Sequence, residues 1–83
     1  MGLPKPTRRD VERVSRAFGA TIRALREEKG WSQEEFAHRA RIHVTYLSGL
    51  ERGRRNPTLN VIARLARALG VPLSRLFGQA GSE

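Results

Sequence analysis

The sequence predicts a single, compact all-α domain of five helices, and three observations carry this prediction. Apolar residues recur at steps of three and four along most of the chain, which is the period of helices with one buried face. No segment alternates apolar and polar residues as a half-buried strand does. The 83 residues suffice for one domain with a modest core. We expect this domain over residues 8–77, a flexible basic arm over 1–7 and a flexible tail over 78–83.

The first expected helix is long and begins after Thr7, which has the spacing of a capping box with Asp10. Gly19 interrupts the helix at a cost of about 1 kcal/mol, so the turns before it are free to fray or bend. Trp31 follows the helix and is expected to seal it against the next one. One apolar stripe runs along its length: Val11, Val14, Phe18, Ile22 and Leu25.

Residues 32–57 predict two short helices joined by a tight turn at 41–43. Ser32 and Glu35 have the S-x-x-E spacing of a capping box. Gly53 closes the second helix at the position where a left-handed backbone residue is easiest to accept. Two short helices joined by about 3–4 residues are what a helix-turn-helix requires, with the second helix in the major groove of a duplex. The buried positions of the pair are Phe36, Ala37, Ala40, Leu47 and Leu50.

A fourth helix is expected between the cap Thr58 and the terminator Gly70, and a short fifth helix from Pro72 to Phe77. The apolar band of the fourth helix is wider than one core contact needs. One face holds Leu59, Ile62, Ala66 and Leu69, and the neighbouring face holds Val61, Leu65 and Ala68.

Charge is the strongest signal in the composition. Lys and Arg number 16 against 8 Asp and Glu, and 14 of the 16 are arginine, whose planar fork binds phosphate and guanine edges. A polyanion is the natural partner. A generically basic protein is the alternative, which suits Arg64 and Arg67 better than the cluster Arg52, Arg54 and Arg55.

Several classes of function are disfavoured. The absence of cysteine excludes disulfides and thiolate metal sites, and His38 and His43 lack a third ligand for a metal. No apolar run approaches the roughly 18 residues of a membrane span. We expect a cytoplasmic protein without cofactor, membrane or small-molecule partner. An enzyme is disfavoured because no Gly-rich phosphate loop or ligand cluster is present.

Residues 18–77 resemble the Cro/C1-type (XRE-like) helix-turn-helix domain. The matching segments are LREEKGWSQEEFA, TYLSGLERGRRNPTL and LARALGVPLSRLF. Within the family, TYLSGLERGRRNP is most similar to the controller proteins of restriction–modification systems. The resemblance implies a lambda-repressor-like domain of five helices that dimerises through its C-terminal helices and binds palindromic operators. Double-stranded DNA and a second copy are then the expected partners, with RNA polymerase as a further candidate.

Base contacts are expected from the second short helix and the loop after it. Val44 offers apolar contact, for instance to a thymine methyl group, although many relatives carry a polar or basic residue there. Thr45 can add a hydrogen bond. Gly49 either lets the helix approach DNA closely or serves close helix packing. Arg55 matches a position that reaches a base in controller-like relatives.

Phosphate contacts are expected around these base-contacting residues. Gln33 follows a helix cap, where free amides and the positive helix end favour a phosphate, although it is also an ordinary polar residue at a helix start. Tyr46 has a hydroxyl suited to phosphate or is a half-buried packing residue. The other candidates for phosphate binding are Ser32, Ser48, Arg52, Arg54 and Asn56.

Two structural roles complete the expectations. The resemblance implies that Arg26 pairs with Glu51, an acid that would repel DNA unless neutralised. The dimer interface is expected at Val61, Leu65, Leu73 and Phe77, with Leu76 in the core. Alternatively, Leu65 and Phe77 complete the core of the monomer. Two other functions stay open: an antitoxin that represses its own operon and binds a toxin, and a protein-interaction module.

Overall fold

Residues 4–77 are described by the computed structural model and form five helical elements, with no strand among them. The α-helices are α1 (Arg8–Glu28), α2 (Gln33–Ala40), α3 (Val44–Glu51) and α4 (Leu59–Leu69), followed by the 3-10 helix η1 (Leu73–Phe77). The all-α prediction is confirmed, except that the fifth helix is 3-10 rather than α. The expected tail at 78–83 and the first three residues of the arm lie outside the described part of the chain.

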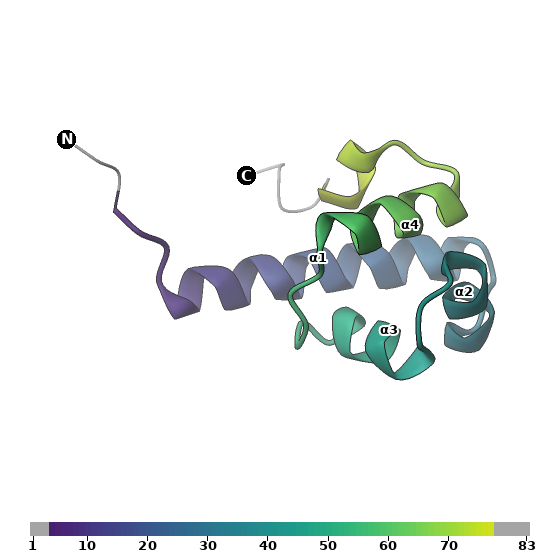
Figure 1. The fold of residues 1–83 in the computed structure, drawn as a ribbon, viewed down its shortest axis with the longest axis horizontal. Helices are drawn as coiled ribbons and strands as arrows, with labels where there is room; N and C mark the ends of the chain where they lie inside the picture. The colour runs from purple at the N-terminus through teal and green to yellow at the C-terminus, as the bar shows by residue number, and fades with distance from the viewer. Residues whose placement is uncertain (1–3, 78–83) are drawn as a thin grey trace.

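Helix α1 is the axis of the molecule, as Figure 1 shows, with α3 to one side of it, α4 and η1 to the other, and α2 beside its C-terminal end, where it packs on both α3 and α4. Thr7 caps it with the expected box: each of Thr7 and Asp10 accepts from the backbone N–H of the other at 3.0 Å. The helix runs through Gly19 without a break. Gly19 is buried, and a methyl group there would collide with the Leu50 carbonyl oxygen of α3. It therefore allows two helix backbones to approach closely.

The N-terminal turns of α1 project beyond the body formed by the other helices (Figure 1). The apolar stripe of α1 is consequently covered over only part of its length. Phe18, Ile22 and Leu25 are buried, whereas Val11 is 42% exposed and Val14 is 52% exposed.

Helices α2 and α3 form the helix-turn-helix pair, and their ends have only part of the expected capping. Ser32 accepts from the backbone N–H of Glu35 at 3.0 Å, but the Glu35 carboxylate binds Arg39 at 2.6 Å. The reciprocal half of that predicted box is therefore missing. Arg41 ends α2 in the left-handed conformation with φ 59°, and His43 begins α3 without a side-chain cap. Trp31 packs on Phe36 of α2 with ring centroids 5.8 Å apart, and its carbonyl oxygen accepts from Arg26 of α1 at 2.8 Å.

Helix α4 begins and ends where its local signals indicate. Thr58 accepts from the backbone N–H of Val61 at 3.2 Å, and Gly70 takes φ 71°. Leu65 is fully buried, so its assignment to a dimer interface is wrong and the alternative of a core residue holds. The face of α4 that carries Leu65 is therefore covered by the rest of the domain. Leu59 is 84% exposed at the first turn, outside the face on which it was expected to be buried, and Leu76 is buried as expected.

Candidate nucleic-acid interface

The C-terminal end of α3 is held by a buried ion pair. Arg26 of α1 donates to Glu51 from Nε at 2.7 Å and from Nη2 at 3.0 Å, in the bidentate geometry that suits a guanidinium and a carboxylate. The side chains are 11% and 3% exposed. Arg26 Nη1 also donates to the carbonyl oxygen of Trp31 at 2.8 Å. The hydrogen bonds to Glu51 raise the pKa of Arg26 above its ordinary value, against the opposing effect of burial.

Gln33 joins this pair and has a different position from the one expected. Its Nε2 donates to Glu51 Oε1 at 2.9 Å. Since Glu51 thus binds both Arg26 and Gln33, the network ties together α1, α2 and α3. One amide hydrogen of Gln33 is committed inside the protein, which leaves the other for a phosphate. No local sequence signal connects Gln33 with Glu51, because the two residues lie 18 positions apart.

The first turn of α3 has one exposed and one half-buried candidate reader. Thr45 is exposed, so its hydroxyl is available to a base edge. Val44 is half-buried and packs against the core, which leaves only part of its side chain for contact with a thymine methyl group. Thr45 and Gly49 lie four residues apart and therefore share one face of the helix.

Gly49 does not reach the surface, so its assignment as a base-contacting position is wrong. A methyl group added there would lie 3.0 Å from Cγ and 3.1 Å from Nε of Arg55. The Arg55 side chain thus lies over Gly49, on the face of α3 that also carries Thr45. The alternative of close helix packing belongs instead to Gly19, where the nearest atoms are backbone atoms of α3.

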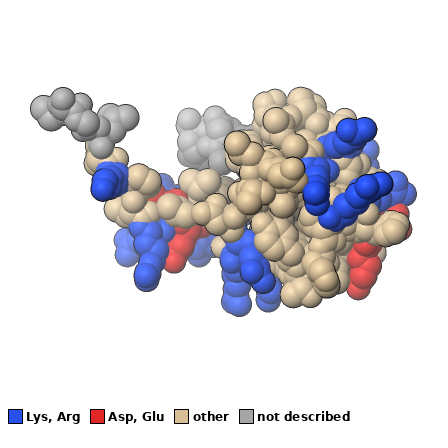
Figure 2. All heavy atoms as spheres, in the orientation of Figure 1, with Lys and Arg blue, Asp and Glu red and all other residues tan. Residues whose placement is uncertain are grey.

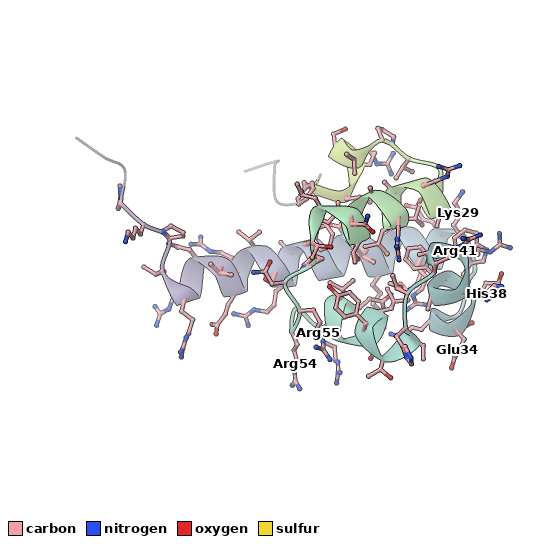
Figure 3. The ribbon with its side chains drawn as sticks, in the orientation of Figure 1. Lys29, Glu34, His38, Arg41, Arg54 and Arg55 are labelled. Atoms are coloured by element: carbon pink, nitrogen blue, oxygen red, sulfur yellow. The ribbon has the colours of Figure 1, made fainter. Side chains whose placement is uncertain are left out.

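The loop after α3 gathers the arginines expected to bind DNA. Figure 3 labels Arg54 and Arg55 at the same end of α3, and Figure 2 shows Lys and Arg side chains along this lower edge of the molecule. Arg52 is exposed, with its Nε 3.3 Å from the carbonyl oxygen of Ser48. The remaining phosphate candidates are exposed at Ser32 and Asn56 and half-buried at Tyr46 and Ser48.

Arg16 is a candidate that sequence reasoning missed. It lines a hollow of about 540 Å³ together with Arg52, Arg54 and Arg55, and Glu12 of α1 lines the same hollow. Gly53, with φ 75°, brings the loop against α1, because a methyl group there would lie 2.8 Å from the Cα atom of Arg16. No motif marks Arg16, since only the folded loop places it beside the other three.

Positive charge is not confined to this side of the molecule. A second hollow, of about 660 Å³, is lined by two alanines and four arginines from α2, α4 and the turn after α2: Arg39, Arg41, Arg64 and Arg67. Within residues 4–77, none of Arg41, Arg64 and Arg67 has a carboxylate within ion-pair distance. Charge alone therefore does not locate the DNA-binding face, and the geometry of α3 is needed as well.

Two features are absent from the described part of the chain, a membrane-spanning helix and a cluster of potential metal ligands. Its helices include none that is long and apolar enough to cross a membrane. Residues 4–77 contain no group of three or more histidine, aspartate or glutamate side chains that could hold a metal ion.

The packing of α3 on α1 and of α2 on α3, together with the exposed face of α3, defines a helix-turn-helix protein of the Cro/C1 type, a class of DNA-binding transcriptional regulators. Residues 22–76 match the helix-turn-helix family HTH_3, and the chain belongs to this family.

Three proteins resemble this chain in sequence or in structure. The HTH-type transcriptional regulator y4dJ of Sinorhizobium fredii is 53% identical over 58 residues, which span 70% of this chain and 75% of that protein. The restriction-modification controller protein C.AhdI from Aeromonas hydrophila has a similar structure, with a TM-score of 0.74 and 42% identity over 75% of this chain and 94% of that one. The controller protein C.Esp1396I, solved as a tetramer with its natural 35 base-pair operator, matches with a TM-score of 0.71 and 31% identity over 78% and 86% of the two chains.

Proposed function

We propose that this protein is a homodimeric, sequence-specific transcriptional regulator that binds palindromic operators, in the manner of a restriction–modification controller. One observation carries the proposal: Thr45 and the Arg55 side chain share one face of α3, whose far end is held by the buried Arg26–Glu51 pair. A rigid helix with a donor-rich outer face is what readout in a major groove requires.

The proposed contacts divide into two groups. Thr45 hydrogen-bonds a base edge, and the Arg55 guanidinium suits O6 and N7 of guanine. The other side chains contact the sugar–phosphate backbone, which sets the register of the helix without reading sequence. This second group consists of Ser32, Gln33, Tyr46, Ser48, Arg52, Arg54, Asn56 and, from the folded structure, Arg16.

We expect the DNA affinity to be steeply dependent on salt. Each phosphate that a basic side chain neutralises releases counterions, so log affinity should fall against log salt with a slope of about −0.9 per contact. Fluorescence anisotropy with a labelled duplex, from roughly 50 to 200 mM salt, measures this slope. Arg54→Ala should make the slope less negative by about one contact, whereas Arg23→Ala, on an exposed pair with Glu27, should leave it unchanged. A slope near zero for the wild type would contradict the proposal.

A dimer is favoured by an uncovered apolar surface. Leu73 is 51% exposed and Phe77 is 39% exposed, although the Phe77 ring also packs on Phe18 with centroids 5.1 Å apart. Val14 of the projecting end of α1 lines one hollow with Phe77 and so extends this surface. Val61, the remaining predicted interface residue, is half-buried. A two-fold axis would bury the same patch on both subunits.

We expect Leu73→Glu to dissociate this dimer. The substitution places a charge in the centre of an apolar contact, where its desolvation is unfavourable. Sedimentation velocity at micromolar concentration should find a dimer for the wild type and a monomer for Leu73→Glu. Ser74→Glu is the matched control, since it adds the same charge at an exposed neighbouring position and should remain dimeric. A wild-type monomer that binds single half-sites with undiminished affinity would rule out the dimer.

A further inference from the structure

The Arg55 side chain is exposed, and its stem lies against the outer face of α3 at Gly49. A methyl group on Gly49 would meet three atoms of that side chain: Cγ at 3.0 Å, Nε at 3.1 Å and Cδ at 3.5 Å. At the far end, the guanidinium carbon lies 5.5 Å from the centre of the Tyr46 ring, within range of a cation–π contact. Gly49 and Tyr46 thus contact successive parts of one arginine.

The backbone that carries Arg55 is held independently of these contacts. The N–H of Arg54 donates to the carbonyl oxygen of Gly49 at 2.8 Å, and the N–H of Gly53 donates to that of Leu50 at 3.0 Å. Gly53 packs on the backbone of α1 at Arg16. The loop therefore fixes where the side chain starts, and the surface of α3 decides where the guanidinium ends.

We propose that Gly49 and Tyr46 are positioning residues that set base specificity without touching a base. Gly49 provides the space that lets the Arg55 stem lie flat on α3, and the Tyr46 ring holds the guanidinium in one orientation before DNA binds. An arginine side chain that no other residue holds in place loses most of its rotamer freedom when it binds a guanine. An arginine already held on the helix loses less, which favours the correct base by pre-organisation. The inference rests on the proposed role of Arg55 as a reader.

Gly49→Ala separates positioning from folding unusually well. The three atoms nearest to the added methyl group all belong to the exposed Arg55 side chain, so only that side chain has to move. Alanine also has a higher helix propensity than glycine. The variant should therefore melt at the wild-type temperature or above it, which a residue required for packing would not do.

The test measures equilibrium affinity of the full chain for its best selected duplex and for that duplex changed at each base pair of one half-site. Arg55→Ala should abolish preference at one base pair. Gly49→Ala should lower the preference at that same base pair by about five- to thirtyfold, as expected for one arginine's lost ordering, and leave the other positions unchanged. The double variant should be no worse than Arg55→Ala. Tyr46→Phe, which keeps the ring, should retain the preference that Tyr46→Leu reduces.

The outcomes separate the positioning role of Gly49 from the proposed role of Arg55 as a base-reading residue. Full wild-type preference in Gly49→Ala, together with its loss in Arg55→Ala, would overturn the positioning role and leave the proposed function standing. A lowered melting temperature in Gly49→Ala would also overturn it, because Gly49 would then belong to the fold. Unchanged preference in Arg55→Ala would remove Arg55 from the readers, and the inference would fall with that part of the proposed function.

Discussion

Glu51→Ala should lower the free energy of unfolding by about 3–5 kcal/mol, the usual cost of removing one partner of a buried ion pair. Arg26 is 11% exposed and would keep its charge without the carboxylate that neutralises it. The amide of Gln33 would lose its acceptor as well. Because these groups join α1, α2 and α3, the loss should appear as a lower melting temperature of the whole domain, measured by circular dichroism.

A double-mutant cycle assigns this loss to the pair. Arg26→Ala, Glu51→Ala and the double variant should be strongly non-additive, since either substitution alone removes the same interaction. Glu27→Ala is the control: its partner Arg23 is 64% exposed, and an exposed pair contributes at most about 1 kcal/mol. Additive effects of Arg26→Ala and Glu51→Ala would mean that the two side chains do not stabilise each other.

The helix boundaries were largely predictable because their signals are local. Thr7, Ser32 and Thr58 each accept a hydrogen bond from the third residue after them, and Gly53 and Gly70 take the left-handed conformation that terminates a helix. Such contacts depend only on residues within one turn. The second half of the Ser32–Glu35 box failed because Arg39, four residues after Glu35, competes for the same carboxylate.

Periodicity predicts which residues share a face, but not which face the rest of the chain covers. The stripe of α1 is regular, yet Val11 and Val14 are exposed because that end of the helix projects beyond the body. On α4 the opposite occurred, since Leu65 was expected at a dimer interface and is instead fully buried in the core. Both outcomes depend on how the helices pack, which is not encoded within one of them.

The site was predictable in its residue types and less so in its contacts. The basic loop and the pairing of Arg26 with Glu51 follow from the sequence and its family resemblance. The positions of Gln33 against Glu51 and of Arg16 beside the loop arginines require the folded chain. Gly19 and Gly49 illustrate the point, because each is a mid-helix glycine and only the tertiary structure reveals that one faces backbone and the other faces Arg55.

Arg55→Ala and Thr45→Ala should relax base preference, with each losing about 1–3 kcal/mol of discrimination at its own position. Gln33→Ala should weaken binding to all duplexes about equally, because a phosphate contact carries no sequence information. It should also lower the melting temperature, since its amide binds the buried Glu51. Selection of binding sites from random duplexes with each variant measures the preferences. Unchanged preference in Arg55→Ala would move that residue to the phosphate-binding group.

The same selection with the wild-type protein tests the central claim, that a dimer reads DNA through α3. If two copies of α3 enter successive major grooves, their centres should lie about 34 Å apart, which is one turn of the duplex. The enriched duplexes should then contain an inverted repeat whose half-sites are one helical turn apart, and Leu73→Glu should select single half-sites only weakly. Recovery of random sequence without any enriched motif, from a folded protein that binds DNA, would contradict the claim.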